Sequence, residues 1–242
     1  MTNPAPESLV PRHPVASPES LRSTKASIPS VADGGRFLLT RSGRSAIAMA
    51  LRAAGLVAGD RVLVPDYYCP TMIAPVEAVG AKPVFYPLTA RGAPDLEWLD
   101  HSEQGRGGAL LAAHFFGLPI TMQPLRRFCD QRGLVLIEDC AHAYFGSHEG
   151  VAVGATGDYA IASLPKFHAV PEGGLLVYRE GSELAGFPAG KARASAIAAA
   201  WHILEHSAEH HRLPVLGGPV RWLSRQRSRA QLRTEGTDGV RP

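Results

Sequence analysis

The chain has 242 residues, of which 45% are hydrophobic and 19% are charged, and its formal net charge is +3. This composition fits a globular chain with one substantial core, and so small a charge requires neither a nucleic-acid nor a membrane partner. No stretch reaches the length of an apolar membrane span. Cys69, Cys129 and Cys140 include no CxxC pair, so we expect no disulfide framework, no zinc knuckle and a cytoplasmic location.

Residues 1–35 are rich in Pro, Ser and Ala and lack the apolar core of a secretory signal. Such a composition buries little apolar surface. We therefore expect a disordered leader over these residues.

Between residues 36 and 180, short apolar runs alternate with helix-like segments, which predicts an α/β fold. Near-continuous apolar strands with helices between them indicate a mainly parallel sheet sandwiched by helices. The last two runs are too close in sequence for a helical crossover, so one of them is expected to be antiparallel. The expected strands are 36–40, 60–65, 82–88, 108–117, 134–140, 158–164 and 173–180, and the expected helices are 45–56, 70–80, 95–104 and 122–133.

The sequence changes character after residue 180. Residues 181–216 include a long Ala-rich stretch and are expected to form a helical extension. Residues 217–242 are rich in arginine and end in turn-forming residues, so we expect a basic, flexible tail. We expect this tail to bind no nucleic acid, because it lacks interleaved aromatic residues beyond Trp222.

Three polar groups follow strands of the expected sheet, whose carboxyl ends are where open α/β sheets bind ligands. The turn 41–46 opens a helix with small residues, and a helix N-terminus can bind phosphate. Asp139 follows a buried strand and could pair with a cationic ring nitrogen, although a helix N-cap or a structural arginine partner is an alternative.

The third group is Lys166, which lies between apolar Leu164 and Phe167. Partial burial lowers the pKa of a lysine and favours the free amine that attacks an aldehyde. A solvated loop lysine is the alternative. A phosphate turn, an acid and an amine are the three groups that a pyridoxal phosphate (PLP) site needs.

Five stretches resemble, in this order along the chain, the DegT/DnrJ/StrS-type sugar aminotransferases. They are SGRSAIAMALRAAGLVAGDRVLVPDYY, GAKPVFYPL, HFFGLP, GLVLIEDCAHAYFG and GDYAIASLPKFHAVPEGGLLV. The resemblance implies a PLP-binding large domain of fold type I over residues 36–180, with the family's small C-terminal domain largely missing. It also implies a homodimer that transfers an amino group from an amino acid, expected to be glutamate, to a keto sugar nucleotide.

The resemblance assigns the cofactor phosphate to a turn and one serine. Gly43, Arg44 and Ser45 form the turn, in which backbone N–H groups and the Ser45 hydroxyl would bind the phosphate. Ser163 would give a further phosphate contact. Arg44 stands where relatives have a small residue, so its side chain must point away or add a charge contact.

The resemblance also assigns residues to the cofactor ring. Asp139 would pair with the pyridinium nitrogen, and His142 would lie near the ring hydroxyl. Lys166 would form the Schiff base and then move a proton during transamination. Tyr68 would stack on the ring, although strict alignment places Cys69 there.

Two alternatives to an active aminotransferase stay open. If Ser163 is aligned without a gap, His168 rather than Lys166 falls at the lysine position, and relatives with histidine there are PMP-dependent sugar dehydratases. The second alternative is a truncated, catalytically silent homologue that acts as a partner or scaffold.

His202, His206 and His210 are spaced by four residues and would share one helix face. Two of them could bind a metal ion. No third ligand is obvious, because Glu205 and Glu209 fall on a neighbouring face. We therefore interpret these histidines as a solvated polar face and expect no metal site.

Overall fold

The computed structural model describes residues 13–21, 27–101, 108–179 and 196–235. The chain divides into two compact units. The larger unit comprises residues 26–167 and 172–192, and the smaller comprises residues 1–25, 168–171 and 193–242.

The larger unit is built on a seven-stranded sheet in the order β1-β9-β8-β5-β4-β2-β3. All neighbouring strands are parallel except β9, which is antiparallel to both β1 and β8. The expected mainly parallel sheet is therefore confirmed, as is the one antiparallel strand. The strands are β1 (Arg36–Thr40), β2 (Arg61–Pro65), β3 (Lys82–Tyr86), β4 (Ala109–Ala113), β5 (Val135–Asp139), β8 (Tyr159–Ser163) and β9 (Gly174–Tyr178).

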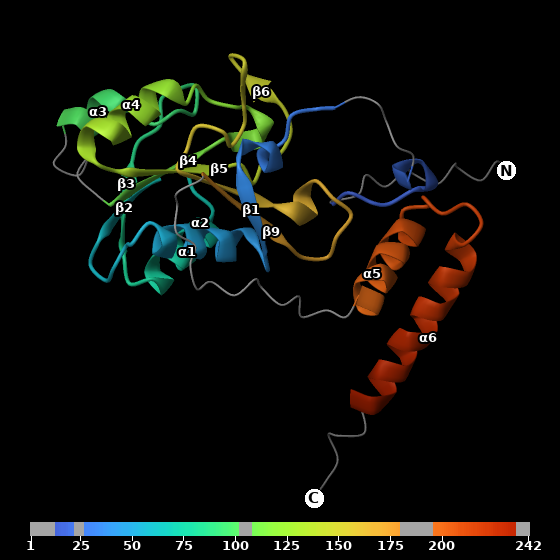
Figure 1. The fold of residues 1–242 in the computed structure, drawn as a ribbon. Coiled ribbons are helices and arrows are strands. Elements are labelled where there is room, and N and C mark those ends of the chain that lie inside the picture. The colour runs from blue at the N-terminus through green and yellow to red at the C-terminus, as the bar shows by residue number, and fades with distance from the viewer. Residues whose placement is uncertain (1–12, 22–26, 102–107, 180–195, 236–242) are drawn as a thin grey trace, which may run out of the picture. The chain divides into compact units, whose positions relative to one another are not determined.

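Helices cover both faces of this sheet (Figure 1). Successive residues of a strand point to opposite faces. On β2, Val62 and Val64 pack in the core cluster that includes buried residues of α1 and α2, whereas Leu63 packs in the cluster that includes α3 and α4. Both faces are thus apolar, as the sequence pattern indicates. The helices are α1 (Gly43–Ala53), α2 (Pro70–Ala78), α3 (Leu96–His101) and α4 (Gln123–Arg132).

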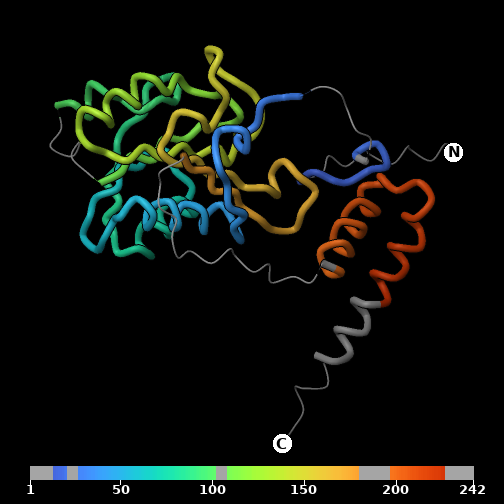
Figure 2. The backbone as a smooth tube through the Cα atoms, viewed as in Figure 1, coloured from blue at the N-terminus to red at the C-terminus, as the bar shows by residue number. Residues whose placement is uncertain are grey.

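The first and last strands of the larger unit lie side by side (Figure 2). Thr40 of β1 is paired with Gly174 of β9, and Gly174 is paired in turn with Ser163 of β8. Just beyond the strands, Ser42 bridges to Gly173. The β1–α1 turn is therefore held beside the end of β8.

Residues 27–35 are packed against the larger unit, unlike the disordered leader that we expected. Val31 is fully buried, and its N–H donates to the Tyr144 carbonyl at 2.9 Å. A short 3-10 helix, Val31–Gly34, follows Ser30. Residues 1–12 and 22–26 of the expected leader lie outside the described residues.

A small hairpin of β6 (Ser147–His148) and β7 (Val151–Ala152) was not expected from the sequence. Its turn residues Glu149 and Gly150 both have positive φ, at 51° and 78°. This is the conformation of the tightest two-residue hairpins.

The smaller unit contains α5 (Ala196–Glu209) and α6 (Gly217–Glu235), which pack against each other. Helix α6 lies where the sequence analysis expects a flexible tail, because its Arg, Gln, Leu and Ala residues favour helix. The fully buried Ser207 accepts a hydrogen bond from the Ala16 N–H at 3.1 Å. Residues 181–195 and 236–242 lie outside the described part of the chain.

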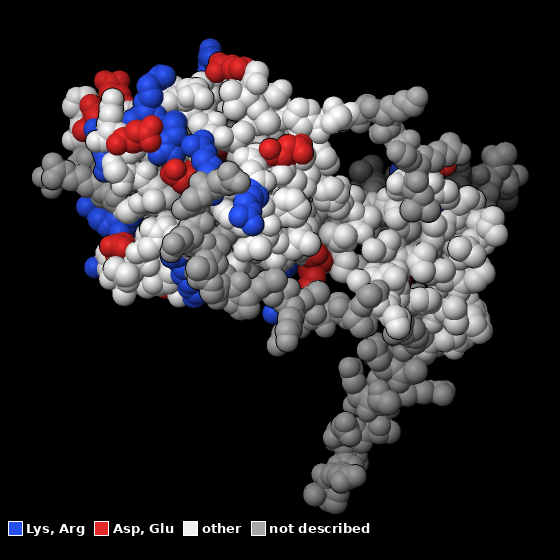
Figure 3. Space-filling view, viewed as in Figure 1, with Lys and Arg blue, Asp and Glu red and all other residues white. Residues whose placement is uncertain are grey.

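Among the described helices, none combines the length and the apolar character needed to cross a membrane. On the face shown in Figure 3, Lys and Arg side chains are interspersed with Asp and Glu over the larger unit. The absence of a nucleic-acid partner stays a prediction.

Candidate active site

A pocket of about 220 Å³ lies at the carboxyl ends of the parallel strands. The segments that line it follow β2, β4, β5 and β8, which are four strands from different parts of the chain. This is the edge at which α/β sheets bind ligands. The lining includes Tyr68 and Cys69 after β2, Phe115 and Phe116 after β4, Asp139 and His142 at the end of β5, and Lys166 after β8.

Asp139 is the last residue of β5 and is 6% exposed. Its Oδ1 accepts the Ala141 N–H at 2.9 Å. Burial raises the pKa of Asp139, against the opposing effects of this hydrogen bond and of the Lys166 charge. The pocket thus holds a carboxylate whose charge is costly until a cation pairs with it.

Lys166 ends the short 3-10 helix Leu164–Lys166 that follows β8. Its charge acts on Asp139, His142 and Cys69, so the amine shares the pocket with these groups. Lys166 is exposed, whereas the sequence predicts that its apolar neighbours bury it in part. Leu164 and Phe167 pack against a core cluster formed with β8 and β9 and leave the lysine at the surface.

His142 lines the pocket beside Phe116. The Phe116 N–H donates to its Nδ1 at 3.5 Å, so its proton is carried on Nε2. Burial lowers the pKa of His142, and the Lys166 charge lowers it further. At neutral pH the ring is therefore a neutral donor through Nε2.

The predicted phosphate turn is placed at the N-terminus of α1. Ser42 caps this helix, and its Oγ accepts the Ser45 N–H at 3.2 Å. A Cβ on Gly43 would lie 3.6 Å from the Ser163 Cβ, so Gly43 and Ser163 are neighbours. The structure thus brings Gly43, Ser45 and Ser163 together. They are not among the residues that line the 220 Å³ pocket.

Arg44 is exposed and forms no ion pair with another described residue. Both expectations for this side chain, pointing away from the turn and adding a charge contact, stay predictions.

The two candidates for ring stacking, Tyr68 and Cys69, both line the pocket. Tyr68 is stacked on Phe85 with ring centroids 5.0 Å apart. Cys69 caps the N-terminus of α2 and accepts a hydrogen bond from the Thr71 hydroxyl at 3.1 Å. That hydroxyl lowers the pKa of the Cys69 thiol.

Sequence reasoning did not single out the aromatic wall of the pocket. Tyr67 meets Phe115 edge to face at 5.4 Å and Phe116 at 6.0 Å. Phe116 has φ of 56°, a left-handed conformation that is rare for a bulky residue and clusters at functional sites. Gly117, which follows the paired phenylalanines, also has positive φ.

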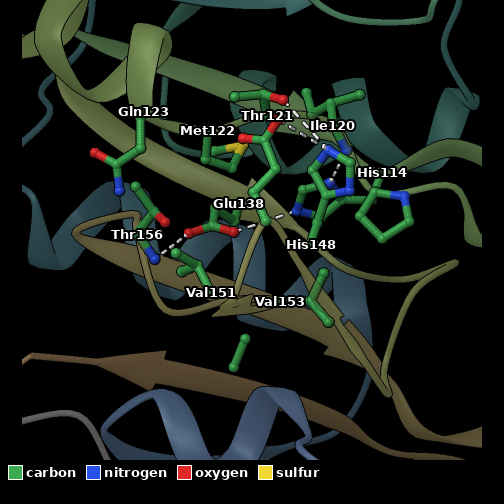
Figure 4. A pocket seen from close by; sticks show the side chains of 13 residues that line it. His114, Ile120, Thr121, Met122, Gln123, Glu138, His148, Val151, Val153 and Thr156 are labelled. Atoms are coloured by element: carbon green, nitrogen blue, oxygen red, sulfur yellow. Dashed lines mark hydrogen bonds and ion pairs between the residues drawn. The ribbon is translucent and has the colours of Figure 1, made fainter.

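The residue before Asp139 belongs to a buried network that borders a second cavity, of about 60 Å³ (Figure 4). Glu138 is 1% exposed and accepts N–H groups from Gly154 at 3.0 Å, from Thr156 at 2.6 Å and from Gly157. It also accepts His114 Nε2 at 3.2 Å. Glu138 therefore fixes the loop before β8 to the ends of β4 and β5.

Residues 35–186 match the DegT/DnrJ/EryC1/StrS aminotransferase family. This match covers more than half of the chain. The chain belongs to this family.

Two of the relatives in this family carry the names of enzymes that act on sugar nucleotides. The chain is 35% identical, over 56% of its length, to the UDP-N-acetyl-3-dehydro-alpha-D-glucosamine 3-aminotransferase of Acidithiobacillus ferrooxidans, and it covers 38% of that protein. It is 33% identical, over 60% of its length, to the dTDP-3-amino-3,4,6-trideoxy-alpha-D-glucose transaminase of Streptomyces venezuelae, of which it covers 45%.

Solved structures show the same fold. An aminotransferase from Psychrobacter cryohalolentis is 27% identical with a TM-score of 0.58, and the match covers 62% of this chain and 39% of that one. The chain thus spans less than half the length of these relatives. The DegT/DnrJ/EryC1/StrS enzymes are PLP-dependent aminotransferases.

Proposed function

We propose that this chain binds PLP in the 220 Å³ pocket and serves an aminotransferase of the sugar-nucleotide type. The reaction would move an amino group from an amino acid, glutamate in our proposal, to a keto sugar nucleotide. The observation that carries the proposal is the presence of Asp139 and Lys166 in one pocket at the carboxyl edge of the sheet. Membership of the family and the names of the relatives support it.

The chemistry of the residues fits PLP. Asp139 is a buried carboxylate that needs a cationic partner, which a protonated ring nitrogen supplies. His142 offers Nε2–H to the ring hydroxyl. The N-terminus of α1, with Ser45 and Ser163 beside it, offers N–H and O–H donors to the phosphate. Bound PLP supplies an aldehyde for amines and a ring that withdraws electrons.

Lys166 has two tasks in this proposal. Its Nζ would hold the cofactor before substrate enters, and once free it would move a proton to and from the substrate carbon. An exposed lysine on a short 3-10 helix can leave and return without unpacking the core. The aromatic residues of the wall help to exclude water from the ring.

The alternative position of the active group, His168, would make the protein a PMP-dependent sugar dehydratase. Lys166 is among the residues that line the pocket, whereas His168 is not. We therefore assign the active position to Lys166 and favour transamination.

A spectral titration tests the cofactor proposal. We expect PLP to give a visible absorbance band with the full-length protein, and borohydride reduction to fix the cofactor to the peptide that contains Lys166. The variant Lys166→Ala should give neither result, and Lys82→Ala, an exposed lysine on β3, should give both. A protein that stays colourless with excess PLP would refute the proposal.

Adding glutamate to the loaded protein then tests turnover. Loss of the visible band with release of 2-oxoglutarate supports the aminotransferase. Binding of PLP without this half-reaction supports the silent homologue, and water loss from a keto sugar with added PMP supports the dehydratase. We further propose a homodimer, which sedimentation analysis with and without PLP would test.

A further inference from the structure

The C-terminal end of α5 brings together three side chains that can bind a metal ion. One ligand atom from each of His206, Glu209 and His210 lies within 4.8 Å of the other two. Glu209 Oε2 is 3.7 Å from His206 Nδ1, so the glutamate is not confined to a neighbouring face as the sequence analysis assumed. Residues three apart are neighbours on a helix surface, and this proximity supplies the third ligand.

We propose that His206, Glu209 and His210 bind a divalent transition-metal ion of the zinc type. This site is separate from the PLP proposal and uses none of its residues. Two histidines four residues apart on a helix face are a known arrangement for binding one zinc ion.

The hydrogen bond of His210 prepares it as a ligand. Its Nδ1 lies 3.0 Å from the His206 carbonyl oxygen, which can only accept, so Nδ1 carries the proton. The lone pair of neutral His210 is then on Nε2. Metal-ligating histidines characteristically donate their other N–H to a carbonyl or carboxylate in this way.

His206 also has an arrangement that a cation would complete. Its Nδ1 faces the Glu209 carboxylate, so Nδ1 is the atom of His206 that would bind the ion. Ligands about 2.0–2.1 Å from a tetrahedral zinc ion are roughly 3.3 Å apart. The 3.7 Å between His206 Nδ1 and Glu209 Oε2 is therefore close to what a shared ion requires.

The surroundings favour a positive charge and allow a fourth ligand. Helix α5 ends at Glu209, and the C-terminal end of a helix dipole attracts cations. The Glu209 side chain is 61% exposed and that of His206 is 26% exposed. A water molecule can therefore reach the fourth position. Two imidazoles and one carboxylate suit zinc better than magnesium or calcium, which prefer oxygen ligands.

A second group of potential ligands, His114, Glu138 and Cys140, does not support the same inference. Both oxygens of Glu138 already accept backbone N–H groups, and its Oε2 also accepts His114 (Figure 4). Burial raises the pKa of the Cys140 thiol well above its ordinary value, which opposes the thiolate that binds metal.

Calorimetric titration of the full-length, tag-free protein with Zn²⁺ tests the proposal. After removal of metal with a chelator, we expect one equivalent of Zn²⁺ to bind. Removing one of three ligands should weaken binding roughly tenfold or more in His206→Gln and in His210→Gln. Glu209→Gln should weaken it less, because the amide oxygen can still approach the ion.

Two histidine variants serve as matched controls. His101→Gln removes a helical histidine whose Nδ1 also bonds the carbonyl four residues before it, at 2.8 Å, but which belongs to no described cluster of metal-ligating side chains. His202→Gln removes the ring that lies parallel to His206 at 6.2 Å. Both should bind Zn²⁺ like the unaltered protein. Circular dichroism would confirm that each variant keeps its helices.

Three results would overturn the proposal. The first is unchanged Zn²⁺ affinity in both His206→Gln and His210→Gln. The second is a loss in His202→Gln without a loss in His210→Gln, which would move the ion one turn along the helix. The third is a loss in Cys69→Ser, which would place the ion on the exposed thiol.

Discussion

We expect the charged Asp139 carboxylate to destabilise the folded protein when no cofactor is bound. It is a buried carboxylate whose one hydrogen bond comes from the Ala141 N–H among the described residues. Burial outweighs that hydrogen bond and the Lys166 charge, since the net effect is a raised pKa. A raised pKa means that the folded protein holds the charged carboxylate less favourably than the unfolded chain does.

We therefore expect Asp139→Asn to make the cofactor-free protein more stable and to weaken PLP binding. The asparagine Oδ1 can still accept the Ala141 N–H, but the buried charge is gone. Loss of a charged hydrogen bond of about 1.5–3 kcal/mol corresponds to roughly tenfold to hundredfold weaker PLP binding. Urea denaturation and PLP titration measure the two effects. Asp66→Asn, at an exposed position after β2, should change neither.

The raised pKa of the Asp139 carboxyl also predicts how the free energy of unfolding depends on pH. Because the folded pKa of Asp139 lies above its ordinary value of 3.8, its contribution to stability is fully present below that value and is lost as the pH rises through the folded pKa. The variant Asp139→Asn should therefore exceed the unaltered protein in free energy of unfolding by an amount that grows as the pH rises from the ordinary pKa of Asp139 through its folded pKa. At higher pH this difference should stay constant. Urea denaturation of both proteins in steps from pH 4 to pH 7 measures it. An advantage that shrinks as the pH rises would contradict the assignment of burial as the dominant effect.

The sequence predicts some residues of the candidate site and misses others. The sequence predicts Asp139 and Lys166 because each lies at or shortly after the end of an apolar strand, and the strand ends of a parallel sheet converge. Phe116 was not found, because a positive φ at a phenylalanine leaves no mark in an apolar run that reads as strand. The exposure of Lys166 was missed for a similar reason, since adjacency in sequence does not say which neighbours turn into the core.

At the scale of secondary-structure elements, Glu138 joins segments that lie far apart in the sequence. Its carboxylate accepts donors from the loop 154–157 and from His114 after β4. A buried polar network of this kind stabilises the fold only when every donor and acceptor in it keeps its hydrogen-bond partner.

We expect Glu138→Ala to lower the free energy of unfolding by about 3–5 kcal/mol, because it leaves several buried N–H groups without an acceptor. Urea denaturation measures the change. Glu149→Ala, on the exposed turn of the β6–β7 hairpin, should stay within about 0.5 kcal/mol of the unaltered protein. Equal effects of the two substitutions would show that the network contributes little.

The sequence predicts strands and helices well where the spacing of their apolar residues follows a clear period. All seven strands of the main sheet and all four of its helices were expected, because apolar runs and amphipathic segments alternate without interruption. The β6–β7 hairpin has two residues per strand, too few for any period to show. The many arginines of α6 led to the prediction of a flexible tail, although the composition of this segment favours helix.

For the larger unit as a whole, β9 determines how the phosphate turn meets the rest of the site. It lies between β1 and β8, and its first residue, Gly174, is paired with Thr40 and Ser163. A Cβ on Gly174 would lie 2.3 Å from the Ser42 carbonyl carbon. The backbone of the phosphate turn therefore occupies the space of the missing side chain.

We expect Gly174→Ala to displace the proposed phosphate turn and to weaken PLP binding at least about tenfold, since we propose that the N–H groups of that turn bind the phosphate. Thermal denaturation and PLP titration measure stability and binding. The matched control is Gly218→Ala on α6, where an added Cβ meets nothing within 4 Å. Because alanine favours helix, this control should keep or raise stability. Normal PLP binding in Gly174→Ala would place the phosphate elsewhere.

The position of β9 between β1 and β8 has a consequence for the spacing of the site. Adjacent strands are about 4.7–4.9 Å apart, so the ends of β1 and β8, on either side of β9, are separated by roughly twice that distance. The phosphate turn begins at one of these ends and the lysine segment at the other. The backbone pairing of β9 with β1 and with β8 therefore fixes where the proposed phosphate turn lies relative to the lysine segment.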